Sequence, residues 1–239
     1  MQISHFFLPP TSWSESLALT GDEARHCTQV TRHSVGDEIM VFDGTGRKAL
    51  ARIEKASKDR VELLALSETL TPKPGAPLTL LQGIVKGDTM EWIIEKAVEL
   101  GVQRIVPVLT QRSVVRLNTA EAAKKREKWQ RVALEACKQC GQAWLPEVAM
   151  PCALDLAIRQ TAQVETKLIA SLEPDADTLK REHRTVTAIA IGPEGDFTPN
   201  EYAALKAAHW QPWSLGSLTL RSETAAICAL SILGYQFAS

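Results

Sequence analysis

The sequence predicts an α/β protein in two parts, a small β-rich domain followed by an α/β domain with a parallel sheet. Short apolar runs separated by turn residues fill the first 70 residues, a pattern typical of a small barrel or sandwich. The segment "TPKPGAP", residues 71–77, is rich in Pro and Gly and is typical of a linker. After it, continuous apolar runs alternate with amphipathic helices, which indicates a parallel sheet covered on both faces. We therefore expect domains at 1–70 and 78–239.

The first domain contains a predicted hairpin. "DEIMVFDGTGRKALARIEKA" predicts a strand, a turn with Gly44 and Gly46, and a second strand, and "RVELLAL" predicts a third. No helix follows the two glycines, so a hairpin turn is favoured over a phosphate loop.

The second domain begins with the buried strand "LTLLQGIV". A helix follows it, with Asp88 as N-cap, Glu91 as its capping-box partner, and Gly101 at its end. Further strands are predicted at "RIVPVLT", "TKLIASLE" and "TVTAIAIG".

Three more helices complete the predicted second domain. Asn118 and Glu121 begin a long helix that runs towards Gly141. A second capping box, Thr198 with Glu201, begins the helix "TPNEYAALKAAHW", and "ETAAICALSILGYQF" forms the last one.

The composition is that of an ordinary globular protein. The chain has 239 residues with 45% hydrophobic and 23% charged residues, and no apolar run approaches the roughly 20 residues that span a bilayer. The five cysteines lack the spacing of a disulfide framework, which indicates a reducing compartment, and the N-terminus does not resemble a signal peptide. We expect a cytoplasmic protein that does not bind membranes.

Charge is unevenly distributed although the net charge is only −1. Residues 71–150 carry 12 Lys and Arg against 8 Asp and Glu. Such a basic region can face phosphates, but it can equally be the solvated face of one helix, and the latter is the more common case. The basic side chains in question are Lys124, Lys125, Arg126, Lys128 and Arg131.

The stretch "AIAIGPEGDFTPNE" is the first candidate site. Its glycines, Gly192 and Gly195, follow a buried strand and precede a helix, and ligands of open α/β sheets bind at that end of the strands. Glycines there permit close approach of a ligand and unusual φ and ψ angles. Glu194 and Asp196 disfavour a phosphate and favour a neutral or cationic ligand. A purely structural turn is the alternative.

The stretch "WSLGSLTLRSETAAICAL" is the second candidate. Arg221, Glu223 and Thr224 gather where the chain enters the last helix, although an acid at a helix start also serves the helix dipole alone. Cys137 and Cys140 form a CxxC inside a predicted helix, without a second pair, and the histidines lack metal spacing. We therefore expect no metal.

Taken together, six motifs resemble the RsmE family, ribosomal RNA uridine N3-methyltransferases of the SPOUT superfamily. In chain order they are "RHCTQVTRHSVGDEIMVFDG", "KGDTMEWIIEKAVELGV", "TQRSVV", "EACKQCGQAWLPEV", "IGPEGDF" and "SLGSLTLRSETAA". The resemblance implies a PUA-like β-barrel for RNA binding and a SPOUT α/β domain with a trefoil knot, acting as a homodimer. The implied reaction is transfer of a methyl group from S-adenosylmethionine to N3 of a uridine in the 16S rRNA of the small ribosomal subunit.

The resemblance also implies site residues. Arg221, Glu223 and Arg112 are the catalytic candidates. Arg221 stabilises charge or orients the base, Glu223 accepts a proton or merely fixes Arg221, and Arg112 belongs to this site or comes from the other subunit. His5, Arg25, Arg32 and Lys86 are candidate RNA contacts, with His5 standing where the family commonly has an arginine. The implied cofactor-binding residues are Leu172, Gly192, Pro193, Glu194, Gly195, Leu215, Gly216, Leu218, Leu220, Thr224 and Ala225.

A second hypothesis keeps the fold but not the reaction. His5 and the nearly neutral net charge are also compatible with an RNA-binding ribosome-assembly factor that lacks turnover.

Overall fold

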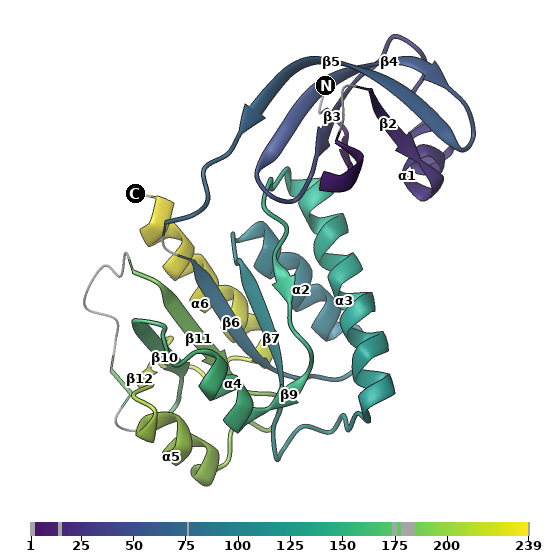
Figure 1. The fold of residues 1–239 in the computed structure, drawn as a ribbon. Coiled ribbons are helices and arrows are strands. Elements are labelled where there is room, and N and C mark those ends of the chain that lie inside the picture. Colours follow the sequence, from purple (N-terminus) through teal and green to yellow (C-terminus); the bar gives the residue numbers. More distant parts are fainter. Residues whose placement is uncertain (1–2, 14–15, 76, 174–175, 178–184, 239) are drawn as a thin grey trace. The chain divides into compact units, whose positions relative to one another are not determined.

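The computed structural model describes residues 3–13, 16–75, 77–173, 176–177 and 185–238. Contacts between residues divide the chain into two compact units. The first comprises residues 1–73 and 134–145, and the second comprises residues 74–133 and 146–239. Each unit is described by itself below (Figure 1).

The first unit is built on one five-stranded sheet with the order β1-β3-β4-β5-β2. β1 pairs in parallel with β3, and the other pairs are antiparallel. Apolar side chains of all five strands pack into one core together with the short helix α1. The strands are β1 (His5–Phe7), β2 (Leu17–Thr20), β3 (Glu38–Phe42), β4 (Arg47–Ala56) and β5 (Arg60–Leu70), and α1 spans Gly21–Arg25.

The predicted hairpin and third strand are confirmed as β3, β4 and β5. The sheet is a half-barrel, because its edge strands β1 and β2 do not pair with each other among the described residues. The strands β1 and β2 and the helical segment from α1 to Val30 were not predicted. Elements of three to five residues are too short to display a period, and only their packing stabilises them.

Within the first unit, a buried lysine connects the end of the long helix α3 (Thr119–Cys140) to the short helix α1. Lys138 Nζ donates to Glu23 Oε1 at 2.8 Å and to Glu135 Oε1 at 3.0 Å, and lies 3.2 Å from His26 Nδ1. The second carboxylate oxygen of Glu23 accepts from the backbone N–H of Phe7 at 3.1 Å. Glu23 therefore joins a strand, a short helix and the long helix within one unit.

The second unit contains a seven-stranded sheet in which every pairing is parallel. The order is β12-β10-β11-β6-β7-β8, and β9 also pairs with β7. All residues of β6 and β11 are buried, which confirms the prediction of a sheet covered on both faces. The strands are β6 (Leu78–Gly83), β7 (Arg104–Leu109), β8 (Glu147–Val148), β9 (Cys152–Ala153), β10 (Thr166–Ala170), β11 (Thr187–Ile191) and β12 (Gln211–Trp213).

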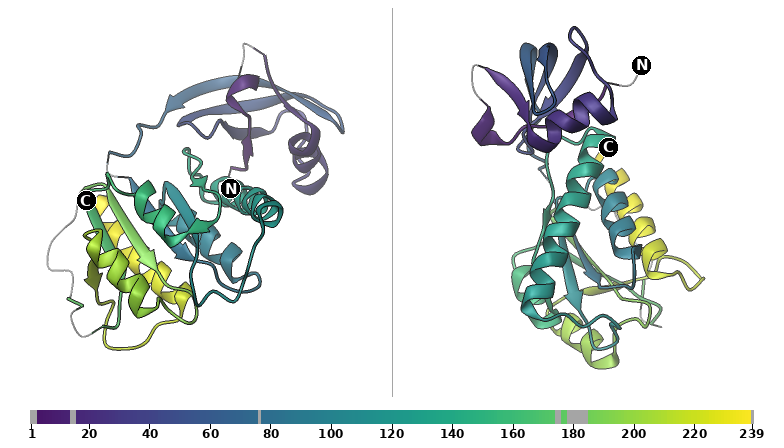
Figure 2. Two further views of the ribbon diagram at one scale, coloured as in Figure 1. Left: turned by 60° about the horizontal axis from the view of Figure 1, so that its bottom comes forward. Right: turned by 90° about the vertical axis from the view of Figure 1, so that its right-hand side faces the viewer.

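Helices cover both faces of this sheet. α4 (Leu154–Gln160) and α5 (Pro199–Ala207) pack on one face, in a core that includes Leu81 and Ala190. α2 (Thr89–Glu99) and α6 (Ser222–Ala238) pack against each other and lie side by side in Figure 2. This arrangement leaves the carboxyl ends of the strands, and the loops that follow them, free to form a site.

Capping boxes form in α5 and α3 but not in α2. In α5, Glu201 N donates to Thr198 Oγ1 and Thr198 N donates to Glu201 Oε2. Asn118 and Glu121 exchange the same two bonds at the start of α3. Asp88 precedes α2 as predicted, but its side chain caps nothing because its backbone is already helical, with φ −86° and ψ −2°. Glu91 instead pairs with Lys128 at 2.5 Å.

The path of the last segment differs from that of a simple doubly wound sheet. From the edge strand β12 the chain returns to the centre, where α6 packs on β6 and β11. Ser222, at the start of α6, is hydrogen-bonded to Gln82 at the end of β6 and to Gly192 after β11. This return path supports the knotted topology that the resemblance implies.

The Glu23 contacts predict an unequal response to two carboxylate deletions. Glu23→Ala leaves the Lys138 ammonium with fewer partners and Phe7 N–H without its acceptor, so we expect a loss of about 2–3 kcal/mol in the free energy of unfolding. Glu135→Ala removes a carboxylate whose side chain is 60% exposed, and we expect less than about 0.5 kcal/mol. Urea denaturation followed by tryptophan fluorescence measures both, and equal losses would contradict the assigned role of Glu23.

Candidate functional site

Loops at the carboxyl ends of the parallel strands enclose a cavity of about 470 Å³ within the second unit. The walls come from three stretches that are far apart in the sequence: the loop after β10, the loop after β11, and the segment from β12 into α6. Thr89, in the first turn of α2, adds a fourth contribution. The lining residues are Thr89, Ala170, Ser171, Leu172, Ile191, Gly192, Pro193, Glu194, Asp196, Leu215, Gly216, Leu218, Thr219, Leu220, Arg221, Ser222, Glu223 and Ala225.

Close packing fixes the loop after β11. A Cβ on Gly83, at the end of β6, would lie 2.5 Å from the backbone nitrogen of Pro193. A Cβ on Gly192 would lie 2.5 Å from Asp196 Oδ1. Both glycines are therefore required by the loop's own packing, whereas the sequence-based hypothesis assigned Gly192 to close approach of a ligand.

A buried polar relay joins the loops. Gln82 is fully buried and donates from Nε2 to Ser222 Oγ at 2.9 Å, and Ser222 Oγ donates to the carbonyl of Gly192 at 2.5 Å. Gln82 Nε2 also lies 2.9 Å from the carbonyl of Gly83, while Gln82 Oε1 has no partner among the described protein atoms. The relay ties the end of β6, the loop after β11 and the start of α6 to one another.

The acidic wall of the cavity is also held in place. Lys86 donates its backbone N–H to Glu194 Oε1 at 3.0 Å. Asp196, which has a positive φ of 58°, accepts from the Tyr202 hydroxyl at 3.0 Å and from Phe197 N at 2.8 Å. Burial is the main cause that raises the pKa of Tyr202, and the nearby Asp196 raises it further, so the phenol stays protonated and remains a donor.

Most predicted cofactor-binding residues lie in the cavity wall. Leu172, Gly192, Pro193, Glu194, Leu215, Gly216, Leu218, Leu220 and Ala225 line it. Gly195 and Thr224 do not belong to the lining: Gly195 packs against Arg112, with a built Cβ 3.1 Å from Arg112 Cβ, and Thr224 is exposed. Gly216 has a φ of 128°, a conformation that favours glycine.

The three catalytic candidates do not all lie in the cavity wall. Arg221 and Glu223 line the cavity. No ion pair joins them in the part of the chain that the structure describes, so Glu223 does not hold Arg221 in place. Arg112 lies outside the lining and donates from Nη1 to the carbonyls of Gly195 at 2.9 Å and Phe197 at 3.2 Å.

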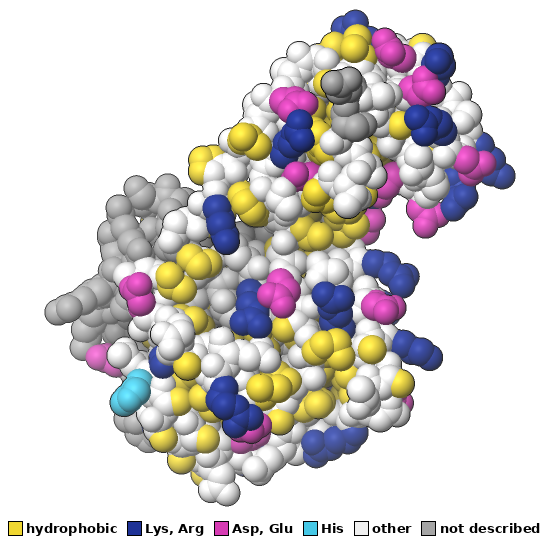
Figure 3. All heavy atoms as spheres, in the orientation of Figure 1, with side chains coloured by type: hydrophobic (Ala, Val, Ile, Leu, Met, Phe, Trp, Pro, Cys, Tyr) yellow, Lys and Arg dark blue, Asp and Glu magenta, His cyan; other side chains and the backbone are white. Residues whose placement is uncertain are grey.

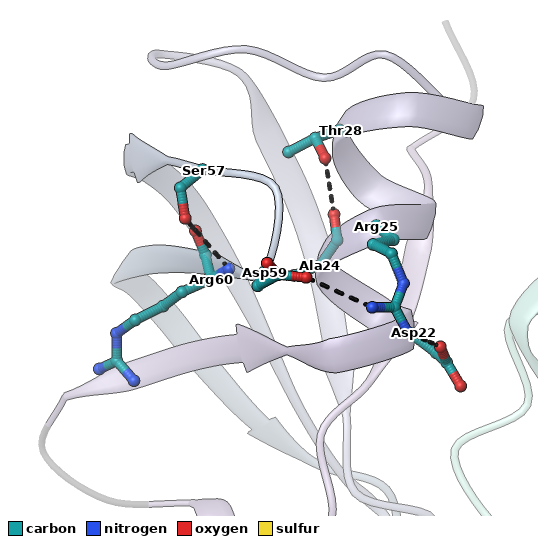
Figure 4. A network of polar contacts seen from close by, with 7 residues as sticks. All are labelled: Asp22, Ala24, Arg25, Thr28, Ser57, Asp59 and Arg60. Atoms are coloured by element: carbon teal, nitrogen blue, oxygen red, sulfur yellow. Dashed lines mark hydrogen bonds and ion pairs between the residues drawn. The ribbon is translucent and has the colours of Figure 1, made fainter.

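The surroundings of two candidate RNA contacts reduce the positive charge that these side chains can offer to a phosphate. Burial, followed by the charge of Lys48, lowers the pKa of His5, so this half-buried side chain is neutral near pH 7. Arg25 is paired with Asp22 and with Asp59, the latter at 3.3 Å, as Figure 4 shows. Its charge is therefore already compensated.

The other two candidate RNA contacts remain accessible. Arg32 is exposed and has a φ of 57°, and Lys86 is exposed in the loop after β6. Both stay candidates for contact with phosphate.

Three contributors to this region were not predicted. Ser171 follows directly on β10, and Thr89 follows the predicted N-cap, so the rule that ligands bind at the carboxyl ends of strands could have found both. Gln82 is the one amide in the apolar run "LTLLQGIV", and an isolated polar residue in a buried strand is a detectable signal.

Two features, a cluster of metal ligands and a membrane-spanning helix, are not found among the described residues. Among the described residues no group of three or more His, Cys, Asp or Glu side chains is arranged to hold a metal. Likewise, no described helix is long and apolar enough to cross a bilayer.

The cavity suits an organic ligand with a cationic centre. Its volume lies in the range of small-molecule sites. Leu172 and Leu218 line it with 57% and 74% of their surface exposed, so apolar surface is available to a ligand. The carboxylates of Glu194, Asp196 and Glu223 supply negative charge. S-adenosylmethionine, with its positively charged sulfur, fits this set of groups.

The fold and the cavity define an RNA methyltransferase with a PUA-like domain. A family model described as "RNA methyltransferase domain" matches residues 71–234, and one described as "RNA methyltransferase PUA domain" matches residues 19–66. The chain belongs to the family of ribosomal RNA small subunit methyltransferase E, the RsmE family, whose fold is of the SPOUT class.

Individual relatives cover nearly the whole chain. Ribosomal RNA small subunit methyltransferase E of Bacillus subtilis is 30% identical over 92% of this chain and 90% of its own length. The structure of that enzyme from Neisseria gonorrhoeae, bound to S-adenosyl methionine, has 33% identity and a TM-score of 0.89 over 97% of both chains. A methyltransferase from Legionella pneumophila in complex with SAM has 31% identity and a TM-score of 0.90 over 98% of both chains.

The two cysteines of the CxxC are predicted to react differently. Burial is the main cause that raises the pKa of Cys137 to about 12, so at pH 8 its thiol stays protonated and shielded. Cys140 is exposed. We expect iodoacetamide to alkylate Cys140 but not Cys137 in the native protein, and both in urea, as read by peptide mass mapping. Equal labelling of both in the native state would contradict the packing of α3.

Proposed function

We propose that the protein transfers a methyl group from S-adenosylmethionine to N3 of a specific uridine in 16S rRNA. The observation that carries the proposal is the cavity, in which the stretches "IGPEGDF" and "SLGSLTLRSETAA" meet although 16 residues separate them. Relatives of 31% and 33% identity were solved with this cofactor bound. No observation in the structure favours the alternative of an assembly factor without turnover.

The residues that would hold the cofactor are those of the three loops. Leu172, Leu218 and Leu220 offer apolar contact, and the main chain at Gly192–Glu194 and Leu215–Gly216 offers hydrogen bonds for an adenine and a ribose. Bound S-adenosylmethionine supplies an electrophilic methyl group on a positively charged sulfur.

Arg221 would serve the uracil. Uracil N3 carries a proton at neutral pH, and losing it places negative charge on the flanking carbonyl oxygens. The Arg221 guanidinium, exposed in the cavity wall, would stabilise that charge or orient the base. The new bond joins N3 to the methyl carbon as the carbon–sulfur bond breaks, and the N3 proton leaves to a base.

Glu223 is the candidate for that base. Of the three carboxylates in the wall, Glu194 accepts from Lys86 N, and Asp196 accepts from Tyr202 and Phe197. Glu223 is half-buried and has no hydrogen-bond partner among the described residues. It is therefore the carboxylate whose oxygens are not already occupied by a donor and can accept the N3 proton.

The wider setting is inferred from the family. We propose that the substrate belongs to the small ribosomal subunit and that the protein acts as a cytoplasmic homodimer. We also propose that residues 1–70 form a PUA-like domain that binds RNA. A linker at 71–77 joins this domain to the methyltransferase domain at 78–239. Arg32 and Lys86 are the accessible candidates for phosphate contact in this scheme.

Removing the Arg221 side chain tests the catalytic assignment. We expect Arg221→Ala to lower kcat for methyl transfer to undermethylated small subunits about 10²–10³-fold, the effect of losing one charge-stabilising donor. Arg221→Lys should recover part of the rate, and calorimetry should find S-adenosylhomocysteine binding retained in both variants. An unchanged rate for Arg221→Ala would contradict the role of this residue.

The wild-type protein in the same assay tests the reaction itself. Mass mapping should place the new methyl group on uridine N3. Wild-type protein that binds RNA but transfers no methyl group would favour the assembly-factor alternative.

The packing of Gly83 predicts an effect on the cofactor. Gly83→Ala would place a Cβ against the Pro193 backbone and displace the loop, so we expect at least tenfold weaker binding of S-adenosylmethionine by calorimetry. Gly75→Ala is the matched control, because nothing lies within 4 Å of its built Cβ and it requires no positive φ. Equal affinities in the two variants would show that the loop does not form the binding surface.

A further inference from the structure

Six of the twelve arginines in the described part of the chain pair with a carboxylate. Arg47 pairs with Glu68 at 2.8 Å, Arg52 with Glu38 at 3.0 Å, and Arg159 with Asp155 at 2.9 Å. Arg25, Arg60 and Arg104 have acidic partners as well. In Figure 3, basic side chains are interspersed with acidic and hydrophobic ones on the face shown. Among the described arginines, contact with RNA is therefore best sought at the six that lack such a partner: Arg32, Arg112, Arg116, Arg126, Arg131 and Arg221.

Two uncompensated arginines lie on a single loop of the second unit, the one after β7. Arg112 donates from Nη1 to the carbonyls of Gly195 and Phe197. Arg116 donates from Nη1 to the carbonyl of Thr110 at 3.2 Å and from Nη2 to that of Gln111 at 3.0 Å. Neither guanidinium has a carboxylate partner among the described residues. Main-chain carbonyls orient a guanidinium but leave its full positive charge uncompensated.

The loop that carries them is internally fixed. The side chains of Thr110 and Ser113 are buried, and each accepts from the backbone N–H of the other, at 3.1 Å and 3.2 Å. Gln111 N donates to Glu201 Oε1 at 2.8 Å, the carboxylate that also caps α5. The two arginines are thus presented by a rigid frame, which lowers the entropic cost of binding an anion.

The loop adjoins the cavity. Arg112 packs on Gly195, and the two neighbours of Gly195, namely Glu194 and Asp196, line the cavity wall. Both arginines are exposed and retain N–H groups without acceptors among the described residues: Nε and Nη2 of Arg112, and Nε of Arg116. Such fixed, exposed N–H groups match the oxygens of a phosphate.

We propose that Arg112 and Arg116 form a phosphate clamp that holds the RNA backbone beside the target nucleotide at the rim of the cavity. The inference rests on the proposed function, because it takes RNA as the substrate. It gives Arg112 a part different from the catalytic one suggested by sequence: it lies outside the cavity wall and holds the strand from which the uridine is presented. The clamp increases the affinity for RNA and takes no part in the methyl-transfer step.

The test is the salt dependence of RNA binding by Arg112→Gln, Arg116→Gln and the double variant. The probe is fluorescein-labelled oligouridylate, measured by anisotropy over a series of salt concentrations. Each lost phosphate contact should lower the slope of log K against log salt by about 0.7, the value for single strands. We expect each single variant to bind about fivefold more weakly at low salt, and the double variant to show both losses.

Arg159→Gln is the matched control, since it removes the same charge from the same unit at an arginine already paired with Asp155. It should leave the slope and the affinity unchanged. With small subunits as substrate, the KM of the clamp variants should rise while kcat stays near the wild-type value. A double variant with the wild-type slope and affinity would overturn the clamp, as would an equal change in Arg159→Gln.

Two further measurements separate the possible failures. Calorimetry with S-adenosylhomocysteine shows whether Arg112→Gln disturbs the loop at Gly195. If it does, Arg116→Gln decides the matter alone, because its bonds reach only Thr110 and Gln111. Wild-type protein without affinity for RNA would refute the proposed function, whereas normal wild-type binding with unaltered clamp variants would refute only the clamp.

Discussion

The site depends on one buried hydrogen-bonded relay, from Gln82 through Ser222 to the carbonyl of Gly192. Three segments separated by up to 140 residues meet there. The Gln82 amide has no access to water, so its bonds are costly to leave unmade and the loops cannot part without exposing them. The close approach of Gly83 to Pro193 adds a steric constraint at the same place. Together they preserve the shape of a cavity whose walls are otherwise loops.

Charge is divided between the inside and the rim of this site. The wall carries three carboxylates, Glu194, Asp196 and Glu223, against the one guanidinium of Arg221, whereas Arg112 and Arg116 lie on the loop beside it. A single basic surface would bind RNA but would oppose a positively charged donor. The division accounts for a protein that acts on RNA with a net charge of −1, because the cations need only be uncompensated where the strand lies.

Hydrophobic patterns and helix-capping residues account for most of what was correctly predicted in the second unit. The continuous apolar runs became β6, β7, β10 and β11, and the capping boxes at Asn118 and Thr198 formed. Asp88 shows the limit of such local rules, because its backbone is helical and Glu91 found a partner in Lys128, which is distant in sequence. The edge strands β1 and β2 were not predicted, since their pairing with β3 and β5 is what makes them strands.

The sequence by itself determined the alternation of strands and helices, the stretches that would carry the site, and through its ordered motifs the family. Those properties depend on neighbours along the chain. Only the tertiary structure showed that packing requires a glycine at position 192 and that Gln82 connects the loops. It also showed that carboxylates neutralise Arg25 but not Arg112 or Arg116, and that Arg112 lies outside the cavity. Each of these depends on residues distant in sequence, because packing and charge compensation are settled by what lies nearby in space.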